Sequence, residues 1–79
     1  MRQGESWIIE IHNDHINTHA GVTLVLSEVL GYATETAYRV AGDIDRSGRV
    51  DLTPCPWEQG EKVVAALQVH GLRARLRHA

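Results

Sequence analysis

The spacing of apolar side chains predicts that the chain begins with a strand. One side of the segment from Trp7 to His12 carries Trp7, Ile9 and Ile11, and the other carries Ile8, Glu10 and His12. A period of two, built from β-branched and aromatic residues, is typical of a β-strand. The polar residues directly after it predict a corner at the end of the strand.

The period then changes to that of a helix. From about residue 18, apolar residues recur at i, i+3, i+4 and i+7, and these are Val22, Val25, Leu26 and Val29. Asn17 or Thr18 can cap the start of this helix, and Gly31 is placed to end it. A second helix is expected from about Ala33, with the same spacing in Ala37, Val40, Ala41 and Ile44.

The second half of the chain predicts a strand, a helix and a strand. Gly48 marks a turn before the short strand "RVDLT". Pro56 suits the first position of a third helix, whose core face combines Val63 or Val64 with Leu67 and which Gly71 closes. The alternating segment "LRARLRH" predicts the last strand.

The order β-α-α-β-α-β predicts an α+β fold, with a three-stranded antiparallel sheet packed against three helices. We expect residues 7–79 to form one domain and residues 1–6 to be a short flexible N-terminus. With 79 residues and 43% hydrophobic side chains, the chain has material for one small core.

Charge and composition narrow the classes of function. Ten acidic and eight basic residues give a formal net charge of −2, which does not favour nucleic acid as a partner. Arg73, Arg75 and Arg77 alternate along the last strand, and we interpret them as a small solvated face. The single cysteine, Cys55, excludes an internal disulfide and suits a reducing compartment. No segment has the length and hydrophobicity of a membrane span or a signal peptide, so we expect a cytoplasmic protein.

Two clusters allow a metal site as an alternative. His12, His15 and His19 have the spacing H-x2-H-x3-H, although the run crosses a strand end, a loop and a helix start. Within "DIDRSGRVDLTP", Asp43, Asp45 and Ser47 occupy positions 1, 3 and 5 of a calcium loop. Position 12, which normally supplies a bidentate carboxylate, is Pro54. We therefore interpret this segment as a helix-turn-strand with solvated aspartates, in which the loop is a turn.

The polar corner after the first strand suits the recognition of a cation. Asp14 supplies a negative charge and Asn13 a carbonyl acceptor, which together fit a free α-amino group. The chain has no nucleophile motif and no glycine-rich phosphate loop, so we expect no enzymatic activity and no cofactor. An asparagine and an aspartate after a strand also form ordinary turns, and the dipeptide alone does not decide between the two.

The layout of the whole chain resembles the ClpS family, adaptors that recognise N-terminal residues (N-degrons) and pass substrates to a Clp AAA+ ATPase. Over about 70 residues, the order and spacing of five segments match the family pattern. The segments are "WIIEIHND", "NTHAGVTLVLSEVLGY", "ETAYRVAGDIDRSGRV", "WEQGEKVVAAL" and "HGLRARL". The initial tryptophan and the Gly-Tyr pair between the helices are most similar to the actinobacterial type.

The resemblance implies roles for individual positions. The family's pair that holds the substrate α-amino group falls on Asn13 and Asp14. The acidic or proline residue that follows is His15, the polar residue at the pocket edge is Asn17, and an apolar pocket wall is kept as Val22.

Several pocket positions depart from the family pattern. The methionine that guards the pocket mouth is His19, the pocket methionine is Ala41, and the pocket valine is Ile44. The histidine that assists amine binding is Asp45, which puts a second carboxylate beside Asp14. Because Ala41 is short, we expect a deeper pocket and a preference for bulky aromatic or basic first residues.

Contacts with the ATPase are also implied by the resemblance. Glu58 and Glu61 fall where the family presents acidic contacts to the N-domain of the Clp ATPase, while Val63 replaces the family's lysine and Lys62 lies one place away. Only six residues precede Trp7, where family members carry a longer extension used in delivery. We therefore keep a repurposed or engineered ClpS-like peptide-binding module without protease delivery as an alternative, and a small calcium or zinc module as a third.

Overall fold

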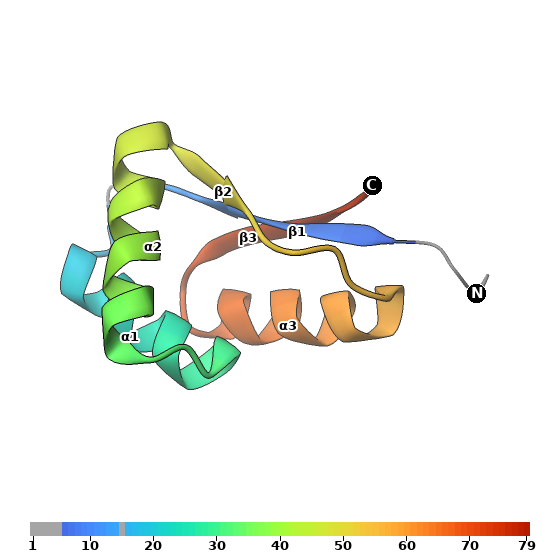
Figure 1. Ribbon diagram of the computed structural model, residues 1–79, viewed down its shortest axis with the longest axis horizontal. Coiled ribbons are helices and arrows are strands. Elements are labelled where there is room, and N and C mark those ends of the chain that lie inside the picture. The colour runs from blue at the N-terminus through green and yellow to red at the C-terminus, as the bar shows by residue number, and fades with distance from the viewer. Residues whose placement is uncertain (1–5, 15) are drawn as a thin grey trace.

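The structure, a computed structural model, describes residues 6–14 and 16–79. Residues 1–5, most of the segment expected to be flexible, lie outside the described residues. The elements are β1 (Trp7–His12), α1 (His19–Leu30), α2 (Thr34–Ser47), β2 (Arg49–Asp51), α3 (Trp57–Val69) and β3 (Arg73–His78). This order confirms the predicted α+β fold (Figure 1).

The three strands form one antiparallel sheet in the order β2-β1-β3. Helix α3 lies along one face of this sheet, and the hairpin of α1 and α2 packs at the end where β1 stops (Figure 1). Strand β1, the first in sequence, is therefore central and has its C-terminal end beside α1 and α2. The polar corner after β1 lies at this junction.

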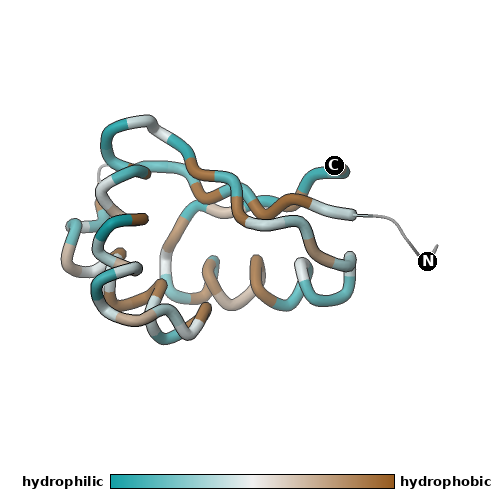
Figure 2. The backbone as a smooth tube through the Cα atoms, in the orientation of Figure 1, coloured by the Kyte–Doolittle hydropathy of each residue, from teal (hydrophilic) through white to brown (hydrophobic). Residues whose placement is uncertain are grey.

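The core fills the space between the sheet and the helices, where Figure 2 shows hydrophobic segments of all layers turned towards one another. Its largest fully buried side chains are Ile11 from β1, Leu26 from α1 and Leu67 from α3. Each belongs to an apolar face that the residue spacing predicts. Burying these faces is the main source of stability for so short a chain.

The ends of the helices agree closely with the predicted caps. The Thr18 side chain accepts a hydrogen bond from the Gly21 backbone N–H at 3.0 Å and caps α1. Gly31 and Gly48 end α1 and α2 with φ values of 73° and 84°, a left-handed conformation that glycine adopts without steric cost. Pro56 occupies the N-cap position directly before α3 and is not its first helical residue, because its ψ of 152° is extended.

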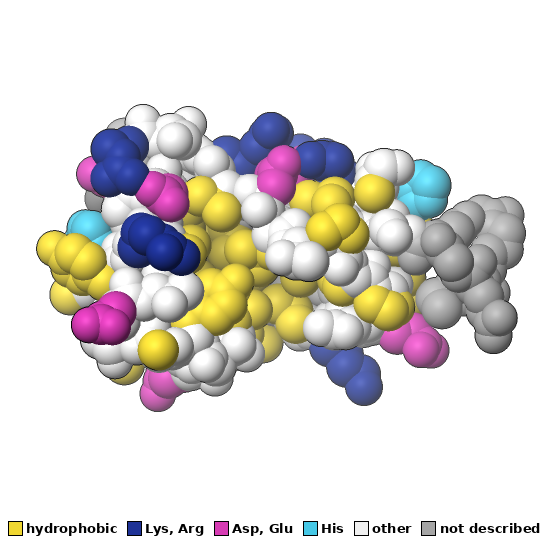
Figure 3. Space-filling model, viewed as in Figure 1, with side chains coloured by type: hydrophobic (Ala, Val, Ile, Leu, Met, Phe, Trp, Pro, Cys, Tyr) yellow, Lys and Arg dark blue, Asp and Glu magenta, His cyan; other side chains and the backbone are white. Residues whose placement is uncertain are grey.

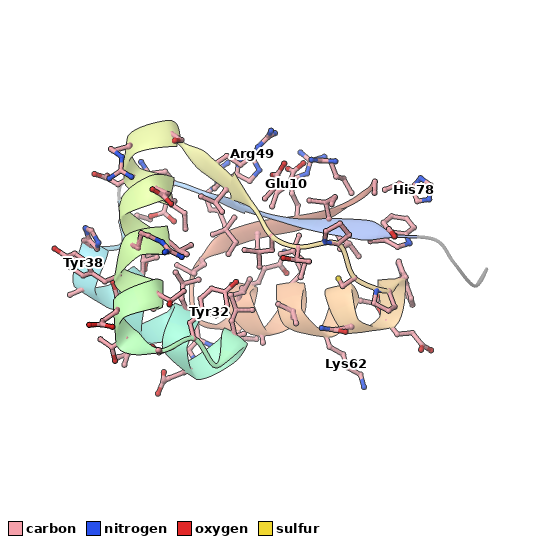
Figure 4. The ribbon with its side chains drawn as sticks, viewed as in Figure 1. Glu10, Tyr32, Tyr38, Arg49, Lys62 and His78 are labelled. Atoms are coloured by element: carbon pink, nitrogen blue, oxygen red, sulfur yellow. The ribbon has the colours of Figure 1, made fainter. Side chains whose placement is uncertain are left out.

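The arginines of β3 are solvated as predicted, but they surround a buried carboxylate that the sequence did not indicate. Glu10 of β1 is only 4% exposed, although it lies on the side away from α3. Arg75 and Arg77 of β3 lie within 4 Å of its carboxylate, and Arg49 of β2 approaches it from the other side (Figure 4). This part of the face is therefore an ion-pair network whose centre is covered by arginine side chains.

Candidate functional site

Asp14 is held in a fixed orientation at the corner after β1. Its Oδ1 accepts hydrogen bonds from the backbone N–H groups of Ile16 and Asn17, both at 2.9 Å. The Asn17 side-chain amide donates to both Asp14 oxygens, at 3.2 and 3.0 Å, and also to the carbonyl oxygen of Gly71 at 2.9 Å. The corner is thus a turn closed by an aspartate, and Asn17 ties it to the residues before β3.

These hydrogen bonds keep Asp14 charged. The pKa of the Asp14 carboxyl is lowered below its ordinary value, first by the hydrogen bond from the Asn17 backbone N–H and then by the one from the Ile16 backbone N–H. The Asn17 side chain and the charge of Arg73 lower it further by smaller amounts. Asp14 therefore carries a full negative charge at neutral pH. Backbone N–H groups occupy Oδ1, while the only hydrogen bond to Oδ2 among the described residues comes from Asn17.

A cavity of about 340 Å³ opens beside this carboxylate. Asn13 and Asp14 line it together with Ile16, Gly71 and Arg73. The structure thus brings together the two residues that the sequence predicts to bind an amine, and both face a space that a ligand can enter.

The end of α2 lies against the same corner. The Asn13 backbone N–H donates to the carbonyl oxygen of Gly48 at 2.9 Å. Asp45 lies three residues before Gly48, in the last turn of α2, and is exposed. Asp45 does not line the cavity at Asp14, so the structure does not bring the second expected carboxylate to this cavity.

The expected apolar wall belongs to the core between α1 and α2. Ala41 and Ile44 are each 3% exposed, and Val22 packs against the same cluster. A first side chain reaching Ala41 and Ile44 must therefore enter between α1 and α2.

His19 covers part of this region. Its ring stacks on Tyr38 with centroids 4.4 Å apart, and its Nε2 is 3.1 Å from the Tyr38 carbonyl oxygen. A Cβ atom placed on Gly42 would lie 3.5 Å from Cε1 of the same ring. His19 thus lies against α2 at Tyr38 and Gly42. His15, the remaining expected pocket residue, lies outside the described residues.

The two metal interpretations gain no support from the described residues. Residues 43–47 belong to α2, Gly48 ends the helix and β2 follows at Arg49, which confirms the helix-turn-strand interpretation of this segment. Asp43 there forms an ion pair with Arg46. His12 hydrogen-bonds to Glu10 at 2.9 Å, whereas His19 contacts Tyr38. Apart from residues 1–5 and 15, no group of three potential ligands is close enough to hold a metal ion.

Glu58 and Glu61, the expected ATPase contacts, lie exposed near the start of α3. Glu61 borders a groove of about 320 Å³ that is also lined by Trp7, Trp57 and Leu76. Lys62 projects from α3 into solvent (Figure 4). The surface therefore combines carboxylates with apolar side chains, which suits contact with another protein.

Two residues of the site were missed by the sequence reasoning. Tyr38 could have been found from helical spacing, because it precedes Ala41 by three residues and Asp45 by seven and so shares their face. Arg73 enters the cavity because β3 begins beside the corner, opposite His12 in register. Only the pairing of β1 with β3 reveals this proximity.

The chain matches one known protein family over almost its whole length. The family described as "ATP-dependent Clp protease adaptor protein ClpS" matches residues 2–75 of the chain. The chain belongs to the ClpS family. ClpS proteins are adaptors of the Clp protease and not enzymes, so this chain is placed in a family of adaptors. A search of the curated proteins gives no match.

The ClpS fold is supported independently by a solved structure. ClpS2 of Agrobacterium tumefaciens, solved bound to L-phenylalaninamide, superposes with a TM-score of 0.87. The match covers 98% of this chain and 100% of that chain at 20% sequence identity, which establishes a common fold. Among the described residues of this ClpS-family chain, no helix has the length and hydrophobicity to span a membrane.

Proposed function

We propose that this ClpS-family chain binds the free α-amino group and the first side chain of N-degron peptides and proteins. The observation that carries the proposal is the charged Asp14 carboxylate, fixed by backbone N–H groups and facing a cavity together with Asn13. An ammonium group donates three hydrogen bonds and needs acceptors that are already oriented. Asp14 Oδ2 and the Asn13 side-chain oxygen fit this need.

The first side chain enters between α1 and α2. Val22, Ala41 and Ile44 are apolar and close to one another in the core cluster, and they form the wall of this site. His19 lies over it and moves aside, or stacks on the incoming side chain, when the peptide binds. Because Ala41 is short, the site accepts bulky aromatic first residues, while Asp45 favours basic ones.

The family membership supports a cytoplasmic adaptor that docks on the N-domain of a Clp ATPase. Glu58 and Glu61 are exposed near the start of α3, at the end of this helix that lies away from the polar corner (Figure 1). A peptide held at Asn13 and Asp14 therefore leaves this surface free. Delivery to the protease is a separate step from peptide binding and needs its own test.

The binding step is tested with labelled peptides that differ only in the first residue, each with a free or an acetylated N-terminus. We expect binding only with the free amine. Asp14→Asn is the decisive variant, because an asparagine oxygen still accepts from the Ile16 and Asn17 backbones while the negative charge is lost. We expect Asp14→Asn to abolish measurable binding and to lower the melting temperature moderately, because the Asn17 side-chain amide loses its acceptor at Oδ2.

Asp43→Asn is the matched control, because it removes one negative charge from an exposed ion pair on α2 and leaves the corner intact. Asp43→Asn should bind like the unchanged protein. Equal binding of acetylated and free peptides, or full binding by Asp14→Asn, would contradict the proposal. Degradation of a bound substrate by the Clp protease, compared between Glu61→Lys and the unchanged protein, tests delivery separately.

A further inference from the structure

A second cavity adjoins the cavity at Asp14, and Arg73 borders both. The second cavity measures about 320 Å³ and is lined by His12, Gln68, Leu72, Arg73, Ala74 and Arg75. Because Arg73 is the first residue of β3 and lies opposite His12, the two cavities follow one another along the start of β3. A polypeptide leaving the amine site in this direction passes the Arg73 guanidinium first.

The charge of Arg73 is not neutralised by an ion pair. In the part of the chain that the structure describes, no carboxylate lies within 4 Å of the Arg73 guanidinium, whereas Arg75 and Arg77 both pair with Glu10. Arg73 is close enough to Asp14 to help lower the pKa of that carboxyl. Arg75 is 3.6 Å from Glu10 and its side chain is 70% exposed, so it remains accessible from solvent.

The surface beside the second cavity is basic. The outer face of the sheet combines four arginines with the two carboxylates of Glu10 and Asp51. Both carboxylates already form ion pairs with Arg77 and Arg49. In Figure 3, basic side chains gather along the sheet side of the molecule with few acidic ones among them. A ligand that follows the cavities from Asp14 therefore meets excess positive charge.

This arrangement has a consequence for ligand choice. A cationic N-terminus bound at Asp14 also experiences repulsion from Arg73, unless the ligand brings a negative charge of its own. An extended chain advances about 3.3 Å per residue, so residues two to four of a bound peptide reach the region between Arg73 and Arg75. Carboxylate side chains at these positions would pair with the guanidinium groups.

We infer that the chain selects polypeptides with acidic residues directly after the first residue, and that Arg73 is the residue that determines this preference. This inference rests on the proposed binding of an α-amino group at Asp14. It specifies the charge of residues two to four of the bound peptide, in addition to the chemistry of its first residue.

The test uses three peptides with the same aromatic first residue and with either glutamate, glutamine or lysine at positions two to four. Affinity is measured at low and at high salt. We expect the glutamate peptide to bind about fivefold more tightly than the glutamine peptide, and the lysine peptide to bind more weakly than either. The differences should shrink at high salt.

Variants assign the effect to Arg73. Arg73→Gln should remove most of the preference, Arg73→Glu should reverse it, and Arg73→Lys should retain it. Lys62→Gln is the control, because it removes one positive charge from an exposed position on α3. Melting temperatures check that all four variants are folded.

The outcomes separate this inference from the proposed function. Equal affinities for the three peptides, with acetylation still abolishing binding, would overturn the preference and leave amine recognition in place. A preference reduced equally by Lys62→Gln and Arg73→Gln would overturn the role of Arg73. Binding that ignores acetylation would overturn the proposed function itself.

Discussion

The Nε atom of Arg77 donates a hydrogen bond to Oε2 of Glu10 at 2.5 Å, across 67 residues of sequence. Arg77 also donates from Nη2 to Asp51 at 2.6 Å, so one guanidinium links β3 to β1 and β2. His12 binds the other Glu10 oxygen at 2.9 Å. A carboxylate that is almost fully buried at the centre of the sheet is thus compensated by arginines from both outer strands and by a hydrogen bond from His12.

Glu10→Gln tests the importance of this carboxylate for stability. The hydrogen bond from His12 is the main cause that lowers the pKa of Glu10 below its ordinary 4.5, with further contributions from Arg77, Arg49 and Arg75. Glutamine cannot neutralise the surrounding arginines. We therefore expect Glu10→Gln to have a lower melting temperature at pH 7, whereas Glu61→Gln, at an exposed position, should leave it unchanged.

The lowered pKa also fixes the pH at which Glu10 stabilises the fold. Because the folded-state pKa lies below 4.5, the stabilisation is complete above about pH 5 and is lost as the pH falls through the folded-state value. Melting temperatures measured between about pH 3 and pH 7 should fall less steeply for Glu10→Gln. Asp14, whose pKa is also lowered, contributes to the pH dependence that remains. Parallel curves for the two proteins would contradict this assignment.

Helix α3 provides a matched pair for the contribution of the core. Leu67 is fully buried and Val69, two residues later, is 83% exposed. Leu67→Ala should lower the free energy of unfolding by about 2–5 kcal/mol, because it removes buried methyl groups and leaves a cavity. Val69→Ala should change it by less than about 0.5 kcal/mol. Urea denaturation measures both, and similar values for the two variants would argue against the packing of α3.

The elements of the fold were predictable because each has a local signature. Ile9 and Ile11 alternate as a strand requires, Leu26 and Leu67 lie on apolar helix faces, and Gly31 ends α1 as predicted. These signals act within one turn or a few residues. They do not depend on where the rest of the chain lies.

The remaining features depend on contacts between distant segments. Glu10 is a charged residue whose burial no local spacing indicates, and only the pairing with β3 brings Arg77 over it. Asn17 donates to Gly71, 54 residues away, and Arg73 reaches the cavity at Asp14 through the same approach of β3. Sequence spacing carries no signal for such pairings in a single chain. The turn at Gly48 was predictable for a local reason, since a residue with positive φ ends the helix there.

Substituting alanine for a glycine inside α2 and for the glycine directly after it should change the free energy of unfolding in opposite directions. Gly42 is inside the helix, and a Cβ there would lie 3.4 Å from Arg46 Nη1 and 3.5 Å from His19 Cε1, which are ordinary contacts. Gly42→Ala should raise the free energy of unfolding by about 0.5–1 kcal/mol. Gly48→Ala should lower it by about 1 kcal/mol or more, because the φ of 84° is unfavourable for alanine. Urea denaturation distinguishes them, and a destabilised Gly42→Ala would show that the space beside His19 is closed.

The single cysteine offers a probe of the contact between β1 and α3. Cys55 is held by two backbone hydrogen bonds with Trp7, at 2.8 and 2.9 Å, and its sulfur faces Gly60 of α3. Burial raises the pKa of the Cys55 thiol, so the folded protein holds less of the reactive thiolate than an unfolded chain at the same pH. Alkylation by iodoacetamide at pH 8.5 should therefore be at least about tenfold slower in the folded state than in denaturant. Equal rates in the two states would mean that the segment before α3 opens freely. Alkylation that is slow in the unchanged protein and faster in Gly60→Leu would show that the packing of α3 protects the thiol.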